Sequence, residues 1–210
     1  MEVLIATGNP GKIREIEEAL RGIPIRLRYL REFVEISPVE EVGKTYEENV
    51  ILKALSYSKQ AGICALADDS GLEVDALGGF PGVRSARYGG DGVSDQERTE
   101  KLLMALSKHH GPERTARFVC CMALAGWASK AGQAGGNEPT VIHICKGSCE
   151  GLIGETARGN NGFGYDPVFI PVGYDNTFGE LPSTVKNVIS HRAQALAEMR
   201  EFLKRRIART

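Results

Sequence analysis

Apolar runs and stretches of helical periodicity alternate along the chain, a pattern typical of α/β proteins. The apolar run at residues 3–6 predicts a buried strand. Apolar positions at helical spacing over residues 13–20 predict a helix that ends before Gly22. The chain is therefore expected to begin with a strand, a tight turn and a helix.

Two longer apolar runs, over residues 115–125 and 140–146, predict two long strands. A glycine-rich segment over residues 131–139 predicts a hairpin-like connection between them. The sequence contains no internal repeat, low-complexity tract or separable linker, so residues 1–210 are expected to form a single domain.

Three helix starts carry capping residues. Thr45 with Glu48, and Ser94 with Glu97, have the spacing of capping boxes, and Ser190 can cap a terminal helix. Capping is also the plain structural explanation for Glu48, a residue that could otherwise be chemically active.

Composition limits the classes of function. The chain has 210 residues and a formal net charge of -1, which disfavours non-specific binding to nucleic acid. No leader segment and no apolar run long enough to cross a membrane is found, so a cytoplasmic location is expected. The five cysteines lack paired zinc-binding spacing and are expected to be reduced, buried side chains.

An acidic pair follows a short apolar run in the segment Leu-Ala-Asp-Asp-Ser-Gly-Leu at residues 66–72. Carboxylates beside a core are costly unless they bind metal, accept hydrogen bonds or exchange protons. One interpretation is that Asp68 and Asp69 cap a turn where the strand ends. If strand alternation continues, the two side chains point to opposite faces, and Asp69 is the better candidate for metal and water.

The turn between the first strand and helix has the features of a phosphate site. Asn9 is a good N-cap and Pro10 a good first helical residue, so backbone N–H groups and the helix dipole are expected to point at one place. Lys12 adds a positive charge in the first turn. The Walker pattern is absent, so this signal alone is modest.

Other candidate side chains lie further along the chain. Lys53 is expected to be solvated unless its helix face looks into a cleft. Phe163, flanked by glycines, could stack on a flat ligand or fill the core. His191 and Arg192 lie in the first turn of the terminal helix, where cations are unfavourable unless an anion or an electron-rich acceptor is near.

These residues carry a resemblance to the inosine triphosphate pyrophosphatase family over nearly the whole chain. The matching motifs occur in family order: Thr7-x-Asn9-x-x-Lys12, Thr45-Tyr46-x-Glu48-Asn49 with Lys53-Ala54, Ala67-Asp68-Asp69-Ser70-Gly71-Leu72, Gly79-x-Pro81-Gly82 with Ser85-Ala86-Arg87-Tyr88, Gly162-Phe163-Gly164-Tyr165-Asp166-Pro167, and Lys186 with Ser190-His191-Arg192. The segment at residues 131–139 matches the family least well.

The resemblance implies an α/β fold with a long mixed central sheet flanked by helices, in two lobes with the nucleotide cleft between them. It also implies a homodimer that uses Mg²⁺ to hydrolyse ITP, dITP and XTP to the monophosphate and pyrophosphate. Asp69 would be the general base and, with Glu48, would bind metal. The implied substrate-binding residues are Thr7, Gly8, Asn9, Pro10, Gly11, Lys12, Lys53, Ser70, Phe163, Gly164, Tyr165, Asp166, Lys186, His191 and Arg192.

The chemistry of the bases agrees with this implication. Hypoxanthine and xanthine carry a 6-oxo acceptor, whereas adenine presents a 6-amino donor, so cationic donors from His191 and Arg192 favour the former. The origin of discrimination against guanine is not evident from the sequence. Two other readings stay open: a Maf-type nucleotide pyrophosphatase, and a nucleotide sensor that binds without hydrolysis.

Overall fold

The computed structural model describes residues 1–90, 92–127 and 138–208. Most of the connection predicted at residues 131–139 lies outside the described residues. No helix in the described ranges is long and apolar enough to cross a membrane.

The chain forms two compact units. The first comprises Met1–Asp69, Cys121–Lys146 and Ala195–Thr210, and the second comprises Ser70–Cys120 and Gly147–Gln194. Three strands supply residues to both units: β3 (Cys64–Val74), β5 (Thr115–Gly126) and β6 (Thr140–Ile153). Hydrogen bonding orders the strands β2-β1-β3-β5-β6-β7, with β4 paired to β3.

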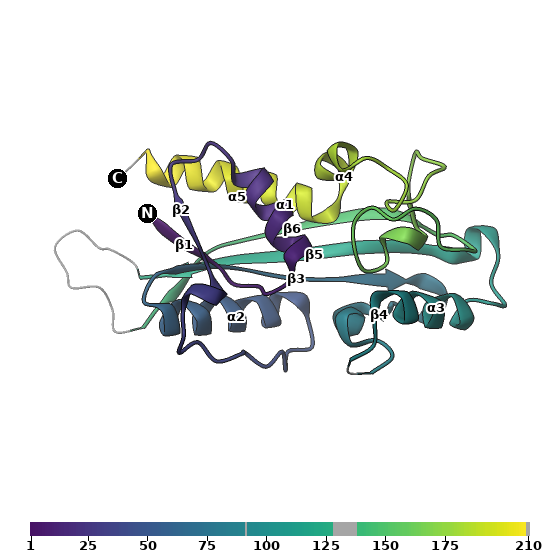
Figure 1. Ribbon diagram of the computed structural model, residues 1–210, viewed down its shortest axis with the longest axis horizontal. Coiled ribbons are helices and arrows are strands. Elements are labelled where there is room, and N and C mark those ends of the chain that lie inside the picture. The colour runs from purple at the N-terminus through teal and green to yellow at the C-terminus, as the bar shows by residue number, and fades with distance from the viewer. Residues whose placement is uncertain (91, 128–137, 209–210) are drawn as a thin grey trace. The chain divides into compact units, whose positions relative to one another are not determined.

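In the first unit, β1 (Glu2–Ile5) pairs in parallel with both β2 (Arg26–Tyr29) and β3. Its helices are α1 (Pro10–Leu20), α2 (Tyr46–Ala61) and most of α5 (His191–Ile207), and a short 3-10 helix spans Leu30–Glu32. Figure 1 shows α2 running alongside β3 and α5 alongside β6. Val50 and Ala54 of α2 pack against alanines of β3 and β5, which allow the helix to approach the strands closely.

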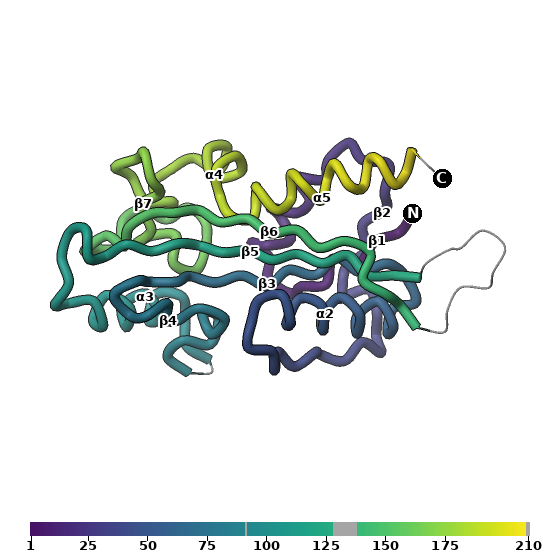
Figure 2. Tube along the Cα trace, turned by 180° about the vertical axis from the view of Figure 1, so that it is seen from behind, coloured from purple at the N-terminus to yellow at the C-terminus, as the bar shows by residue number. Residues whose placement is uncertain are grey.

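The second unit contains β4 (Phe80–Pro81), α3 (Asp95–Ala105), β7 (Phe169–Pro171) and α4 (Ser183–Ile189). Its 3-10 helices span Asp75–Leu77, Gly82–Arg87, Gly111–Arg114 and Asp166–Val168. Strand β4 is antiparallel to β3, and β7 is antiparallel to β6. Figure 2 shows α3 beside β4 and α4 beside β7.

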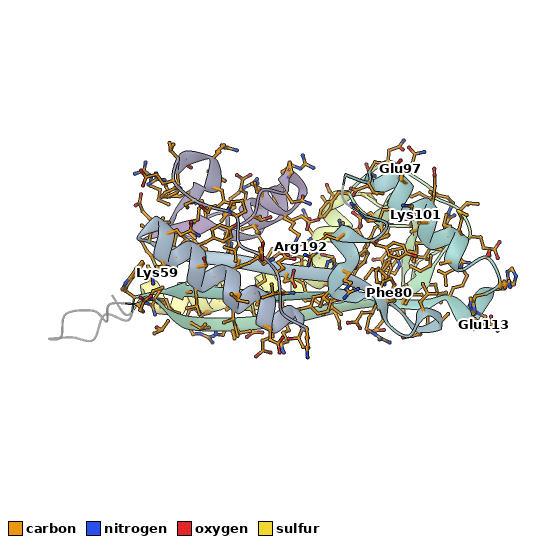
Figure 3. All side chains as sticks on the ribbon, turned by 90° about the horizontal axis from the view of Figure 1, so that it is seen from below. Lys59, Phe80, Glu97, Lys101, Glu113 and Arg192 are labelled. Atoms are coloured by element: carbon orange, nitrogen blue, oxygen red, sulfur yellow. The ribbon has the colours of Figure 1, made fainter. Side chains whose placement is uncertain are left out.

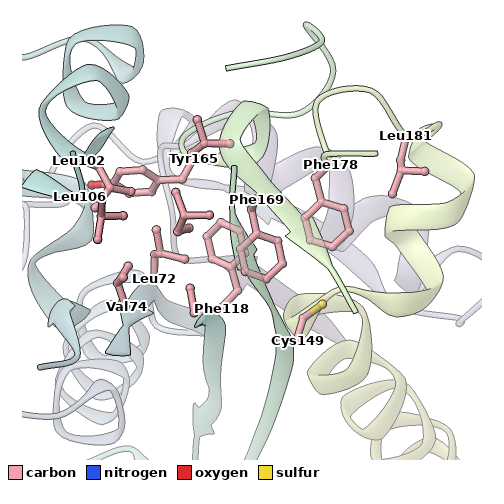
Figure 4. Close-up of a cluster of buried hydrophobic side chains, with 13 residues drawn as sticks. Leu72, Val74, Leu102, Leu106, Phe118, Cys149, Tyr165, Phe169, Phe178 and Leu181 are labelled. Atoms are coloured by element: carbon pink, nitrogen blue, oxygen red, sulfur yellow. The ribbon is translucent and has the colours of Figure 1, made fainter. Parts of the chain in front are cut away.

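An aromatic cluster forms the core of the second unit (Figure 4). The Phe118 ring centroid lies 4.6 Å from that of Phe169 and 6.4 Å from that of Phe178. Leu72 and Val74 of β3 belong to the same buried cluster. The strand that carries the acidic pair is thus held in this unit by its apolar continuation.

The prediction of an α/β fold with a mixed sheet is confirmed, but two predicted strand ends need correction and one helix was missed. Strand β3 does not end at the acidic pair: it continues to Val74 because its later residues pair with β4 and fill the aromatic core. Strand β6 extends beyond the predicted 140–146, to Ile153. Helix α4, which carries Lys186, was not predicted.

Candidate functional site

The turn between β1 and α1 is capped by its own side chains. Asn9 Oδ1 accepts hydrogen bonds from the backbone N of Gly11 at 2.8 Å and of Lys12 at 3.2 Å. Thr7 Oγ1 accepts from Asn9 N at 3.2 Å. The prediction of a helix capped by Asn9 is confirmed, but these amides already have acceptors and are not free to bind an anion.

The lysine of that turn pairs with the first aspartate of β3. Lys12 Nζ lies 2.7 Å from Asp68 Oδ1, and the Asp68 side chain is fully buried. Breaking a buried pair by removing one partner leaves an uncompensated charge, which is strongly destabilising. Lys12 and Asp68 are therefore expected to depend on each other for stability.

The second aspartate contacts helix α2 instead. Lys53 Nζ lies 3.2 Å from Asp69 Oδ1 and donates to Asp68 O at 2.6 Å, while Asn49 Nδ2 donates to Asp69 Oδ2 at 3.2 Å. Asn49 Oδ1 accepts from Gly43 N at 2.7 Å, which orients the amide so that its nitrogen faces Asp69. Lys53 is only 7% exposed, so it is a buried partner of Asp69 and not a solvated surface residue.

Because consecutive strand side chains alternate, Asp68 and Asp69 meet cations from two different helices, α1 and α2. The prediction that the pair points to opposite faces agrees with these partners.

One carboxylate of this cluster was missed from the sequence. Glu41 Oε1 accepts from Lys53 Nζ at 3.0 Å, so Lys53 joins Glu41 to Asp69. The only signal for Glu41 was its place in an acidic stretch before α2, which does not distinguish it from its neighbours.

The start of α2 has one of the two hydrogen bonds of a capping box, and the carboxylate of Glu48 bonds to a different backbone N–H group. Thr45 Oγ1 accepts from Glu48 N at 3.1 Å, as a capping box requires. The return bond goes elsewhere, because Glu48 Oε2 accepts from Lys44 N at 2.6 Å and not from Thr45 N. Its metal-binding role stays a prediction.

For both Asp69 and Lys53, burial shifts the pKa in one direction and the neighbouring charges shift it in the other. Burial raises the pKa of Asp69 above its usual value, although Lys53 opposes the shift. Burial lowers the pKa of Lys53, but the carboxylates of Asp69, Asp68 and Glu41 outweigh it and raise that pKa overall. A carboxylate with a raised pKa is a stronger base than an exposed aspartate and is suited to accept a proton.

The second unit holds a different cluster around Phe163. Lys186 Nζ lies 2.5 Å from Asp166 Oδ2 and 4.6 Å from the centre of the Phe163 ring. Asp166 Oδ2 also accepts from Phe163 N at 2.8 Å. A side chain on Gly162 would collide with that carboxylate, because an added Cβ would lie 2.0 Å from Asp166 Oδ2.

The start of helix α5 contributes two buried basic residues, His191 and Arg192. Arg192 Nη2 donates to Ser70 Oγ at 2.8 Å, and Cζ lies 5.6 Å from the centre of the Phe163 ring. His191 stacks on Phe118 with ring centroids 4.7 Å apart. Arg192, labelled in Figure 3, is only 2% exposed.

Tyr165 has a structural role in the second unit. Its ring is buried, and its hydroxyl donates to Ser85 O at 3.0 Å. Burial raises the pKa of this phenol. Contacts of Tyr165 with substrate, like those of Gly8, Pro10 and Gly11, stay predictions.

The predicted residues thus form two groups, one in each unit. In the first unit, contacts join Lys12 to Asp68 and Lys53 to Asp69. In the second, they join Phe163, Asp166 and Lys186, and Arg192 to Ser70. Asp69 and Ser70 are consecutive residues of β3, so the chain itself links the two groups.

Comparison with known proteins gives concordant matches. A model of the Ham1 family matches residues 3–202. A dITP/XTP pyrophosphatase of Bacillus anthracis is 44% identical over 200 residues, which is 95% of this chain and 95% of that protein. A HAM1 protein from Coxiella burnetii has a similar structure, with TM-score 0.84, 41% identity, and coverage of 98% of this chain and 99% of that one.

A third match is a crystal structure from Mycobacterium abscessus, described as a nucleoside-triphosphatase and dITP/XTP pyrophosphatase. It has TM-score 0.73 and 37% identity, and it covers 95% of this chain and 98% of that one.

Proposed function

The chain belongs to the Ham1 family, and from this we propose that it hydrolyses dITP, ITP and XTP to the nucleoside monophosphate and pyrophosphate. The resemblance expected from the sequence motifs is confirmed by the family match. The observation that best supports the activity is the buried Asp69 carboxylate, held by Lys53 and Asn49 and given a raised pKa.

We propose that Asp69 is the general base. Water is a poor nucleophile, and a positioned carboxylate can take its proton as it attacks phosphorus. The anhydride bond between the α- and β-phosphates breaks, and pyrophosphate leaves. Lys53 and Asn49 fix the orientation of the carboxylate, so its geometry is set before substrate arrives.

Mg²⁺ is the metal proposed for this reaction. No group of three or more His, Cys, Asp or Glu side chains suited to a metal is found among the described residues. Mg²⁺ commonly binds through one or two carboxylates together with substrate phosphates and water, so a smaller set is sufficient. Asp69 and Glu48, the pair that the resemblance implies, would meet that requirement, and Glu41, which shares Lys53 Nζ with Asp69 at 3.0 and 3.2 Å, is a further candidate. The bound ion would neutralise phosphate charge.

Phosphate binding is assigned to side chains of the β1–α1 turn. Because the amides of Gly11 and Lys12 are occupied by Asn9, the proposed donors are the Thr7 hydroxyl, the Asn9 amide nitrogen and the Lys12 ammonium. Lys53 would add a second positive charge. The turn pattern in the sequence suggested that backbone N–H groups bind the phosphates. The proposal assigns this binding to side chains instead.

Base recognition is assigned to the Phe163 cluster. The ring can stack on a purine, and the Arg192 guanidinium can donate to a 6-oxo group but not to the 6-amino group of adenine. Ser70 holds this guanidinium through a hydrogen bond of 2.8 Å. Lys186, Asp166 and His191 are proposed to surround the base.

A substrate panel with pyrophosphate detection tests the proposal. ITP, dITP, XTP, GTP, ATP, dUTP and methylated UTP are supplied with Mg²⁺, and release from the first three is expected to exceed release from the others. Preference for the pyrimidines would support a Maf-type enzyme instead. Tight binding of ITP without pyrophosphate release would support a sensor.

Two further expectations accompany the activity. A homodimer and a cytoplasmic location are proposed from the family resemblance. Light scattering of the purified chain tests the first, and fractionation of the source cells tests the second.

A further inference from the structure

Helix α3 contacts the loop that carries Phe163 through one side chain far away in sequence. Asp95 Oδ2 accepts from Gly164 N at 2.8 Å, across 69 residues of sequence. Gly164 directly follows Phe163, so this bond holds the backbone next to the ring proposed to stack on the base. Gly164 has φ +61°, a conformation that favours glycine.

Asp95 is itself held in place. Its other oxygen, Oδ1, accepts from Arg98 Nη1 at 2.5 Å, and Arg98 Nη2 donates to Val93 O at 2.8 Å. Asp95 is also the first residue of α3, after the Ser94 cap, where a negative charge is favourable. The carboxylate is thus oriented from one side by a guanidinium and offers its second oxygen to the loop.

One side of the loop borders a half-open pocket. The pocket, of about 460 Å³, lies between α3 and the 159–164 loop, lined by Thr99 and Leu103 on the helix side and by Asn160 and Phe163 on the loop side. Close packing normally fixes the position of a side chain, and this side of the loop lacks it. The hydrogen bond from Gly164 N therefore has more influence on the loop than it would in a filled core.

We propose that Asp95 is a positioning residue, which sets the place of Phe163 by holding Gly164 N at the edge of this pocket. The inference rests on the proposed function, because it deepens the role of Phe163 in binding the base. It predicts that loss of the Asp95 carboxylate weakens binding of the purine and leaves the chemistry at Asp69 intact.

The test compares Asp95→Ala, Asp95→Asn, Phe163→Ala and the double variant Asp95→Ala with Phe163→Ala. For dITP with Mg²⁺, Asp95→Ala is expected to raise KM by about threefold with kcat little changed, since one exposed hydrogen bond is lost. Asp95→Asn is expected to be intermediate, because its amide oxygen can still accept from Gly164 N. In the Phe163→Ala background, Asp95→Ala is expected to cause no further rise.

Glu100→Gln is the matched control, since Glu100 also lines the pocket with a carboxylate but accepts from Gln96 on its own helix. It is expected to leave KM and kcat unchanged. Thermal melting of every variant separates lost stability from lost positioning.

An additive effect of Asp95→Ala in the Phe163→Ala background would overturn the inference, as would an unchanged KM in Asp95→Ala beside a raised one in Phe163→Ala. Absence of pyrophosphate release by the unaltered protein would instead overturn the proposed function.

Discussion

The two groups of site residues use positive charge in different ways. In the first unit, Lys12 and Lys53 each lie against a buried aspartate, and both ammonium groups are fixed by carboxylates. In the second unit, Lys186 also pairs with a buried carboxylate, that of Asp166, but it lies over the Phe163 ring as Arg192 does, and Arg192 donates to a neutral hydroxyl. The first arrangement suits phosphates and proton transfer, and the second suits a flat, electron-rich base.

The comparison teaches that chemistry and selectivity can be separated by mutation. Changes in the first group should lower turnover for every substrate to a similar extent. Changes in the second should alter the ratio between substrates.

The largest effect is expected from Asp69→Asn. Loss of the general base should reduce pyrophosphate release from dITP by about a thousandfold, within the usual range for such groups. Circular dichroism should show a retained fold, since the Asn side chain has nearly the same shape and its oxygen can still accept from Lys53. Asp68→Asn is the control and should retain more activity. Full turnover by Asp69→Asn would remove Asp69 from the mechanism.

Lys53→Met tests whether the first group is also a structural unit. Removing the ammonium leaves Asp69 buried without its cation, so the free energy of unfolding should fall by about 3 kcal/mol. Adding Asp69→Asn should restore part of that stability, because the uncompensated charge is gone. Urea unfolding of both variants measures this, and simple additivity would contradict the coupling.

Arg192→Gln tests the second group. Loss of the guanidinium should reduce the preference for ITP over ATP by about tenfold or more, while the slow hydrolysis of ATP changes little. The ratio of the two kcat/KM values is the measurement. An equal loss on both substrates would move Arg192 from selectivity to general binding.

The pH dependence of the reaction follows from Asp69. Its usual pKa is 3.8 and burial raises it, so the carboxylate takes up a proton at a higher pH than an exposed aspartate. The ionised form is the base, and activity should therefore be lost as pH falls through this raised pKa. A profile of kcat/KM against pH should place the acid limb above 3.8. A limb at or below that value would contradict the assignment.

The smallest change is expected when the native protein is treated with a thiol reagent, because the cysteines lie outside both groups of site residues. Burial raises the pKa of Cys121 and of Cys149 to about 11 and that of Cys145 to about 12. At pH 8 these thiols are protonated and should react slowly with a disulfide reagent in the native protein, and quickly in urea. Rapid native labelling of these three, followed by mass spectrometry, would show that the strands open locally.

Much of the site was predictable because its residues carry local signals. The Asn9 cap and the alternation of Asp68 and Asp69 depend only on neighbouring residues, and both agree with the structure. The prediction that the strand ends in a turn at Ser70 and Gly71 was wrong because long-range contacts decide the structure there. Their turn propensity is overridden by pairing of β3 with β4 and by burial of Leu72, which are long-range effects.

Glu41 and Asp95 show a second limit. Each makes its important contact with a residue distant in the chain, Glu41 with Lys53 and Asp95 with Gly164. Neither has a motif of its own, and an acidic residue near a helix start is most simply explained by the helix dipole. Only the structure shows that these two carboxylates accept hydrogen bonds from residues far away in the sequence.

The unbroken course of β3 has a consequence for how this segment can change in length. Because side chains alternate strictly along a strand, one residue inserted or deleted between Leu66 and Asp68 would turn each aspartate toward the other's helix. Lys12 and Lys53 would then face the wrong partners. Substitutions in this strand should reduce activity to different extents, whereas the insertion or deletion of a single residue should abolish it.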